Sequence, residues 1–417
     1  MKLKVIELFG GIGACSKALE NLGIDYEITD YVEIDKYAVA SFNAMHDTNF
    51  EPQDICKWDK DIEADLIMHG SPCQDFSLAG KQAGGDKDSG TRSSLMYETL
   101  RIVEKLKPKY VIWENVKNLV SKKHIHNFEA YQEKMAELGY HNYWKVLNAK
   151  NYGIPQNRER VYTVSIREDL DKGFEFPEGQ ELKLKLKDML EDNVDEKYYL
   201  TDSMIQYLEY GKYQSAKVST KVKQTNTGIC PTLDTMQGGN RQPFVEENKN
   251  LKEQLCDKLI KEEQIKENDV IRHSYSTNRM ENPKMSNSSN NNISPTLDTR
   301  CDCLGIAVKN ATKQGYLIAT DGDGVDISSR MKYHRGNVQK ESIQTIDCTG
   351  GEGHGVVMPD LRIRKLTPKE CWRLMGFDDE SFEKAQTHNS NAQLYKQAGN
   401  SIVVNVLMAI FKNLLDD

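Results

Sequence analysis

The sequence has no apolar run that approaches the length of a membrane span. It also has no secretory pattern at its N-terminus, where Glu7 and two glycines interrupt the first apolar stretch. Its nine cysteines are an odd number scattered without a framework, which is typical of a reducing compartment. An excess of basic residues is missing too: the net charge of −8 argues against a uniformly basic nucleic-acid coat but is compatible with a local basic face. We therefore expect a cytoplasmic protein that does not enter a membrane.

The chain of 417 residues is long enough for two domains, and 38% apolar and 28% charged residues fit a soluble globular protein. Alternating strand and helix signals run to about residue 167 and return from Leu361. This pattern predicts an α/β fold with a doubly wound, mostly parallel sheet, built by residues 1–167 and completed by residues 361–417. Residues 168–360 are then a smaller, β-rich inserted domain.

One short stretch, residues 65–77, organises the chain. Asp65 to His69 is a largely apolar run that predicts a buried strand, and Gly70 to Pro72 end it because proline has no N–H for a ladder. Cys73 follows in the loop at the carboxyl end of the strand, where open α/β sheets place ligands and chemistry. A thiol on this stiff corner is a candidate nucleophile, and the alternative is a buried, inert cysteine.

The N-terminal stretch has the order strand, glycine loop, helix, with Gly10 to Gly13 between Leu3–Phe9 and Ala14–Leu22. Such a loop lets a ligand approach the backbone and the helix N-terminus, although a tight turn without a ligand is the alternative. Glu33 ends the next strand at a spacing common for acids that bind ribose hydroxyls, unless it is a solvated strand end. Asp54-Ile55 is either a third acidic strand end or an ordinary Asx turn.

Two further stretches carry candidate site residues. Glu114 follows the apolar strand Tyr110 to Trp113, so it lies at the same sheet edge as Cys73, unless it is an acid that caps the following helix. Arg158 and Arg160 are two apart in an extended segment and point the same way. They would fork onto phosphates or a carboxylate, and paired surface salt bridges are the alternative.

The last apolar segment, Ile402 to Leu415, predicts a closing helix introduced by Gly399-Asn400-Ser401. A helix with this much apolar surface must pack on the sheet of the first domain. The catalytic α/β domain is therefore expected to be discontinuous in sequence.

The middle region contains an internal repeat. Ile229 to Thr235 and Ile293 to Thr299 share Pro-Thr-Leu-Asp-Thr, and Ser342 to Cys348 is a weaker third copy. Glycine-rich turns and a short β-branched run follow the first and third copies, which favours copies of a β-hairpin unit.

Taken together, these stretches resemble the DNA (cytosine-5) methyltransferase family, whose motifs occur here in the family's order. The matching stretches are Leu8-Phe-Gly-Gly-Ile-Gly13, Glu33, Asp54-Ile55, Gly70-Ser-Pro-Cys-Gln74, Glu114-Asn-Val116, Gln156-Asn-Arg-Glu-Arg160, Arg364-Lys-Leu-Thr-Pro and Gly399-Asn-Ser401. The chain departs at Ala14, where many members have another glycine. The resemblance implies a Rossmann-like methyltransferase domain with the middle region as its target recognition domain.

The resemblance also implies catalytic roles. Cys73 would attack C6 of cytosine, and Glu114 would bind and protonate N3. Arg160 would hold the carbonyl oxygen of the base, with Arg158 supporting it or the backbone. The target base must be flipped out of the duplex, and the loop from Ala79 to Arg92 would close over it.

S-adenosyl-L-methionine is the implied methyl donor, and double-stranded DNA is the implied partner of an expected monomer. The expected cofactor-binding residues are Phe9, Gly11, Ile12, Gly13, Glu33, Ile34, Asp54, Ile55, Pro72, Asn400 and Ser401. Arg241, Arg300 and Arg335 lie near the turns of the middle region and would contact guanines, although these turns are alternatively only a β scaffold. No metal is implied, because the possible zinc ligands Cys301, Cys303, Cys348 and His354 lack the usual C-x-x-C pairs.

Other interpretations fit less well. A nicotinamide-dependent oxidoreductase would need the full G-x-G-x-x-G and has no role for Pro-Cys-Gln. A non-catalytic DNA-binding regulator on the same fold does not need Cys73, Glu114 and Arg160. An RNA cytosine methyltransferase shares the chemistry, and the large insert favours duplex DNA only by analogy. A role in restriction-modification or in protection of DNA is expected, whereas the recognised sequence cannot be derived.

Overall fold

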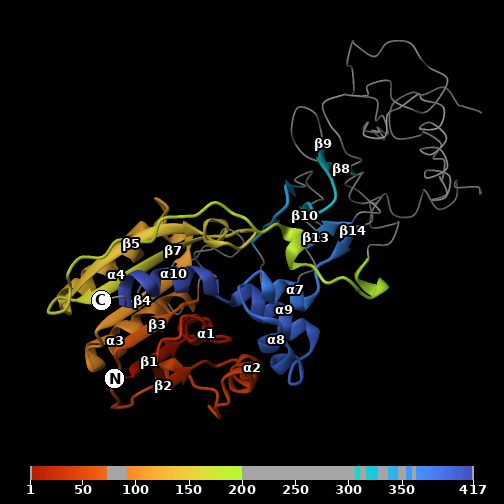
Figure 1. Ribbon diagram of the computed structural model, residues 1–417. Helices are drawn as coiled ribbons and strands as arrows, with labels where there is room; N and C mark the ends of the chain where they lie inside the picture. The colour runs from red at the N-terminus through yellow and green to blue at the C-terminus, as the bar shows by residue number, and fades with distance from the viewer. Residues whose placement is uncertain are drawn as a thin grey trace, which may run out of the picture.

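A computed structural model describes residues 2–72, 92–199, 306–309, 316–326, 337–345, 354–358 and 363–415. Its main sheet has the order β2-β1-β3-β4-β7-β5 (Figure 1). The strands are β1 (Leu3–Leu8), β2 (Tyr26–Val32), β3 (Leu66–His69), β4 (Tyr110–Val116), β5 (Tyr140–Asn148) and β7 (Glu159–Arg167). β1 to β4 pair in parallel, and β7 is antiparallel to both β4 and β5. The expected doubly wound, mostly parallel α/β sheet is confirmed.

Helices cover both faces of this sheet because successive strand residues point to opposite sides. Val5 belongs to one buried cluster and Ile6 to the other. The first cluster includes residues of α1 (Ala14–Asn21) and α10 (Val404–Leu415), and the second includes residues of α3 (Met96–Leu106) and α4 (Ile125–Glu137). Helix α2 (Lys36–His46) packs beyond β2, where Phe42 stacks on Tyr31 with ring centroids 3.8 Å apart.

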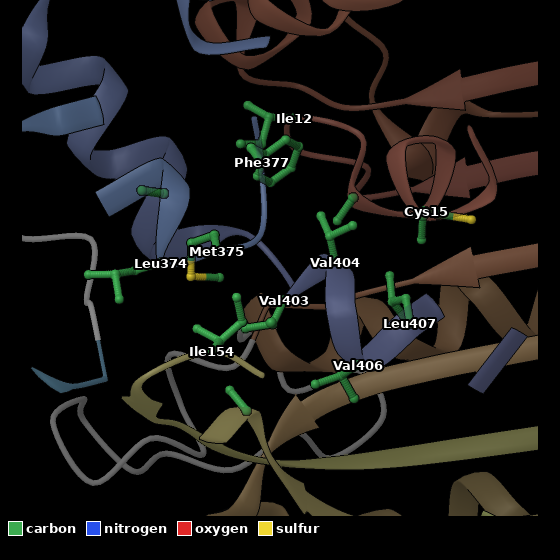
Figure 2. Close-up of a cluster of buried hydrophobic side chains, with 14 of the residues drawn as sticks. Ile12, Cys15, Ile154, Leu374, Met375, Phe377, Val403, Val404, Val406 and Leu407 are labelled. Atoms are coloured by element: carbon green, nitrogen blue, oxygen red, sulfur yellow. The ribbon is translucent and has the colours of Figure 1, made fainter. Parts of the chain in front are cut away.

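Helix α10 closes the sheet although it comes last in the chain. In Figure 2, Val404 and Leu407 lie near Ile12 and Cys15 of the glycine loop and α1. Val403 and Val406 lie on the side of Ile154. The prediction of a closing helix packed on the first domain is confirmed, and the discontinuity of the α/β domain follows from it.

Three shorter helices precede α10: α7 (Pro368–Arg373), α8 (Asp379–Gln386) and α9 (Asn391–Asn400). Helix α7 begins at Pro368, and Thr367 before it forms a reciprocal capping box with Glu370. The stretch Asn391–Leu415 is long and apolar enough to cross a membrane by length and composition, which the sequence analysis did not anticipate. It is divided between α9 and α10, and half of its apolar window is buried inside the protein, so it packs as core.

The described strands of the middle region are short. They are β8 (Ile306–Lys309), β9 (Tyr316–Ala319), β10 (Gly324–Asp326), β11 (Val338–Gln339), β12 (Ile343–Gln344) and β13 (His354–Val357), with β14 (Ile363–Lys365) following. β10 pairs antiparallel with β11 and β13, and β13 with β14. Part of the third repeat forms β12, which pairs in parallel with β6 (Gln156–Asn157) of the first domain. The first two repeats lie outside the described residues, so the hairpin interpretation and the domain boundaries stay predictions.

The described chain also has short 3-10 helices at its turns. They span Ile55–Lys57, Arg92–Leu95, Lys117–Val120, Ala149–Tyr152, Leu186–Met189 and Glu196–Tyr198. Leu186 and Met189 are buried in the same cluster as α10, so the segment after residue 167 still packs on the α/β core.

The turn from β1 to α1 is fixed by a buried carboxylate. Glu7 accepts hydrogen bonds from the backbone N–H of Ser16, at 2.9 Å, and from its hydroxyl. Burial raises the pKa of Glu7 from its ordinary value of 4.5 to about 7, against the smaller lowering by these hydrogen bonds. Gly13 has φ of 76°, and a Cβ there would lie 2.7 Å from the ring of Phe42, so only glycine fits at the end of this turn.

We predict that Glu7→Gln reduces the pH dependence of stability. Because the pKa is higher in the folded state, the native protein binds more protons than the unfolded chain, and stability is lost as the pH rises from about 4.5 through 7. The loss approaches about 3 kcal/mol for a shift of this size. Urea unfolding of the wild type and the variant between pH 5 and 8 measures this loss of stability. Titration of the other groups affects both proteins equally and drops out of the difference between them. Parallel stability curves for the two proteins would contradict the prediction.

Candidate functional site

Three segments meet at the carboxyl edge of the parallel strands. His69 at the end of β3 pairs with Trp113 of β4, so Gly70 and Glu114 follow side by side. A Cβ on Gly70 would lie 3.7 Å from Glu114 Oε2 and 3.4 Å from Ile402 Cδ1. The loop after β3, the end of β4 and the segment before α10 therefore form one edge. Cys73 and the predicted loop from Ala79 lie outside the described residues, whereas Pro72 is within them.

Ser71 anchors the loop that leads to Cys73. Its Oγ accepts a hydrogen bond from Trp113 Nε1 at 3.0 Å, and its carbonyl oxygen accepts one from Asn115 Nδ2 at 3.2 Å. Trp113 packs in turn on the buried ring of Tyr131, at a centroid distance of 4.2 Å. Ser71, next to Pro72, is thereby bound to the two residues of β4 that flank Glu114 in the sequence.

Glu114 is a buried acid, with only 8% of the residue exposed. Burial raises its pKa, and the positive charges of Arg160 and then Arg158 oppose this rise. Arg160 Nε lies 3.2 Å from Glu114 Oε1, yet this oxygen accepts no hydrogen bond of good geometry from the described residues. Val116, not Glu114, occupies the cap of the following 3-10 helix, so the capping alternative is wrong.

The two arginines of the Gln156–Arg160 segment have different partners. Arg158 is buried, and its Nη2 donates to the carbonyl oxygens of Gly399 at 3.2 Å and Ser401 at 2.7 Å. Arg160 lies beside Glu114 and donates from Nη1 to the Glu159 carbonyl at 2.9 Å. The surface-salt-bridge alternative is wrong for this pair, because Arg158 is buried and the partner of Arg160 is the buried Glu114.

The glycine loop and the acid after β2 are in direct contact. Gly11 N–H donates to Glu33 Oε2 at 3.1 Å, and Asp35 N–H donates to Glu33 Oε1 at 2.8 Å. Burial raises the pKa of Glu33, against these backbone hydrogen bonds. Beside it, Ile34 is 69% exposed, an unusual position for a large apolar side chain. Glu33 is therefore not a merely solvated strand end.

The other expected cofactor residues occupy varied environments. Phe9 has φ of 53° and is half-buried, and Ile12 packs into the core near Phe377 (Figure 2). Asp54 accepts a hydrogen bond from Cys56 N–H at 3.0 Å, which is the Asx turn left open by the sequence.

The remaining expected contacts differ in exposure. Ile55 and Ser401 are buried, while Asn400 is exposed. The DNA-contact candidates Arg241, Arg300 and Arg335 and the cysteines at 301, 303 and 348 lie outside the described residues.

Sequence reasoning missed the residues that hold this site together. Ser71 and Trp113 carried no signal beyond a strand and its end. The junction of α2 and α9 was also missed: Lys396 Nζ lies 2.7 Å from Asp35 Oδ2, and Gln397 Nε2 donates to the Tyr37 carbonyl at 2.9 Å. Only the cap position of Asp35 before α2 gave a local signal.

The main sheet is mostly parallel, its glycine loop is bound to the acid that follows the next strand, and a buried acid lies with arginines at the same edge. Together these features define a Rossmann-like methyltransferase. The family model for C-5 cytosine-specific DNA methylases matches residues 3–416, and the chain belongs to this family. The protein is a DNA (cytosine-5-)-methyltransferase, and the oxidoreductase interpretation is excluded.

Relatives match along their whole lengths. The orphan methyltransferase M.SPRI of Bacillus phage SPR is 34% identical, with 99% of this chain and 98% of the relative covered. The type II methyltransferase M.HhaI of Haemophilus parahaemolyticus is 29% identical, with 99% and 94% covered.

Solved structures show the same fold. Dnmt2 methyltransferase of S. pombe has a TM-score of 0.53 at 17% identity over 100% of this chain and 98% of that one. The Entamoeba histolytica methyltransferase EhMeth has a TM-score of 0.54 at 16% identity, with 100% and 99% covered.

We predict that Trp113→Phe slows methyl transfer about threefold to tenfold, the range set by the roughly 1 kcal/mol of one lost neutral hydrogen bond. The phenyl ring keeps the packing but cannot donate to Ser71, so the loop before Cys73 is less fixed. Single-turnover methyl transfer at saturating DNA measures the effect. The matched control is Trp144→Phe on β5, where the side chain is 46% exposed. Equal rates for the two variants would refute the role of this anchor.

Proposed function

We propose that the protein transfers a methyl group from S-adenosyl-L-methionine to C5 of a cytosine in a specific duplex DNA sequence, through a covalent adduct with Cys73. The carrying observation is the buried Glu114 beside Arg160, at the edge where the loop to Cys73 begins. Related orphan phage and type II methyltransferases favour a role in protection of DNA or in restriction-modification. We further propose a cytoplasmic monomer.

The chain's residues supply what the reaction requires. C5 of cytosine is a poor nucleophile, and addition of the Cys73 thiolate to C6 turns C5 into an enamine carbon. After C5 is methylated, loss of the C5 proton allows the C6–sulfur bond to break and restores the ring. The proton passes to a base that is water or a side chain at this edge, and Cys73 leaves as a thiolate.

Glu114 and Arg160 manage charge on the ring. Burial raises the pKa of Glu114 and so favours its protonated form, which can donate to N3 as the thiolate adds to C6. Arg160 holds the carbonyl oxygen of the base from the same side. Both groups are fixed before the base arrives, which is how preorganised dipoles and charges lower a barrier.

The residues near the glycine loop fit S-adenosyl-L-methionine. Each oxygen of Glu33 accepts one backbone N–H and retains a second lone pair for a ribose hydroxyl. The exposed face of Ile34 offers an apolar surface for adenine, and Phe9, Gly11, Gly13 and Pro72 would line the methionine end. Asp54 with Ile55 would contact the adenine, and Asn400 with Ser401 would close the pocket. When bound, the cofactor supplies an electrophilic methyl group.

We predict that 5-fluorocytosine at the target position traps a covalent protein–DNA complex that requires S-adenosyl-L-methionine. Fluorine cannot leave as a proton, so the adduct persists after methylation. A denaturing gel with labelled duplex measures the trapped complex. The matched control is Cys73→Ser, which should form no complex and transfer no methyl groups, because an alcohol is not ionised near neutral pH.

DNA binding separates this result from simple misfolding. Gel-shift titration of Cys73→Ser should give an affinity within about tenfold of the wild type, or 1.4 kcal/mol. Substantial turnover by the serine variant, or a wild type without a cofactor-dependent trapped band, would overturn the covalent route.

We predict that the middle domain decides which sequence is methylated. Single substitutions of Arg241, Arg300 and Arg335 by Ala should relax the methylated sequence at one or two positions, because a good base contact discriminates by about 1–3 kcal/mol. Bisulfite sequencing of a random-sequence library after methylation measures this. Uniformly weaker methylation of all sequences would mark phosphate contacts instead, and an unchanged preference in all three variants would contradict the division of labour.

A further inference from the structure

Arg158 is a buried charge that is held in part by two backbone carbonyls. It is 4% exposed, and its Nη2 binds two backbone carbonyls, those of Gly399 and Ser401. Burying a guanidinium is costly unless strong hydrogen bonds compensate it. The two N–H bonds of Nη2 lie in the rigid guanidinium plane, so their directions are fixed toward two acceptors on one loop. The bonds span 241 and 243 residues of sequence, so they join the strand of Arg160 to the C-terminal loop.

The loop held by Arg158, residues 399–401, lies between two parts of the site: the part around Glu114 and the part around the glycine loop. Gly399 and Ser401 flank Asn400, and the Cδ1 of the next residue, Ile402, lies 3.4 Å from where a Cβ of Gly70 would be, beside Glu114. On the other side the loop continues helix α9, whose Lys396 and Gln397 bind the start of α2 at Asp35 and Tyr37. Asp35 in turn donates its N–H to Glu33. A continuous set of contacts thus runs from the glycine loop to Glu114.

We propose that Arg158 is a positioning residue that couples cofactor binding to base recognition by fixing the 399–401 loop beside Glu114. This inference deepens the proposed function and rests on it. In this role Arg158 acts through the carbonyls of Gly399 and Ser401, while Arg160 is the residue that lies against Glu114. The resemblance implied that Arg158 supports Arg160 or the backbone, and these hydrogen bonds favour the backbone.

Arg158 acts in two physical ways that two substitutions separate. Its planar Nη2 group holds two carbonyls, and its charge opposes the rise of the Glu114 pKa caused by burial. Arg158→Lys keeps the positive charge and N–H donors but loses the planar group that fixes their directions. Arg158→Met loses both and keeps much of the apolar stem.

Calorimetric titration with S-adenosylhomocysteine, in the absence of DNA, tests whether the hydrogen bonds to the two carbonyls support cofactor binding. We expect Arg158→Lys to weaken binding tenfold or more, and Arg160→Lys to change it by less than twofold. Arg364→Lys is the matched control for loss of a buried arginine: Arg364 is 0% exposed and pairs with Glu370 at 2.7 Å. It should lower the melting temperature and leave the affinity of the folded protein within twofold.

The pH profile of single-turnover methyl transfer, at saturating cofactor, tests the charge. The rate should fall as the pH rises through the pKa of Glu114, since the protonated acid is the active form. Removal of a positive charge raises that pKa, so the midpoint should move to higher pH in Arg158→Met and stay in place in Arg158→Lys. A merely structural role would lower the rate without moving the midpoint.

The outcomes distinguish this inference from the proposed function. If the wild type does not bind S-adenosylhomocysteine, the proposed cofactor is wrong. If the wild type binds and Arg158→Lys binds equally well, the coupling role is wrong and the proposed function stands. If Arg158→Met does not fold, the affinities of Arg158→Lys and Arg160→Lys for S-adenosylhomocysteine, compared with that of Arg364→Lys, still decide the question.

Discussion

The burial of helix α10 is the constraint on which the rest of the structure depends. Val404, Leu407, Ile410 and Phe411 are almost completely buried. At about 1.5–3 kcal/mol for each fully buried side chain, this face stabilises the fold by roughly 6–12 kcal/mol, as an upper bound. Closing the chain over roughly 190 intervening residues costs on the order of 5 kcal/mol, because loop entropy grows only with the logarithm of length. The burial of helix α10 therefore outweighs the entropy cost of closing the chain. The loop before the helix then lies at the edge of the sheet where Glu114 is found.

Charged side chains lie close together in the buried environment at this edge of the sheet. Glu114 has two arginines near it, and both act on its pKa against the effect of burial. Burial is the larger of the two opposing effects, so the protonated form of the acid is favoured, which suits the proposed donation of a proton to the base. Glu33 and Glu7 follow the same rule, since each buried carboxylate receives backbone N–H groups that limit the cost of its charge.

Local patterns predicted the strands, most helices and the shared edge at which β3 and β4 end, because parallel strands end at one edge of a sheet. They did not predict partners far apart in sequence. Arg158 was identified as a site residue, yet nothing near it in the sequence points to the carbonyls of Gly399 and Ser401. Periodicity gives the face of a strand, not what packs on it. The pairing of β12 with β6 was hidden for the same reason, since the repeat pattern favoured a hairpin.

A second buried arginine helps to tie together two segments that are far apart in the sequence, around residues 190 and 364–373. Arg364 binds Glu370 through both terminal nitrogens, and Glu370 also accepts the N–H of Glu191 at 2.8 Å. Arg373 donates to the carbonyls of Met189 and Leu190. The segment around Glu191 is thus tied to the segment around Arg364. A buried ion pair adds little net stability but defines one geometry. Both ends of the region between these segments are therefore fixed on the α/β core.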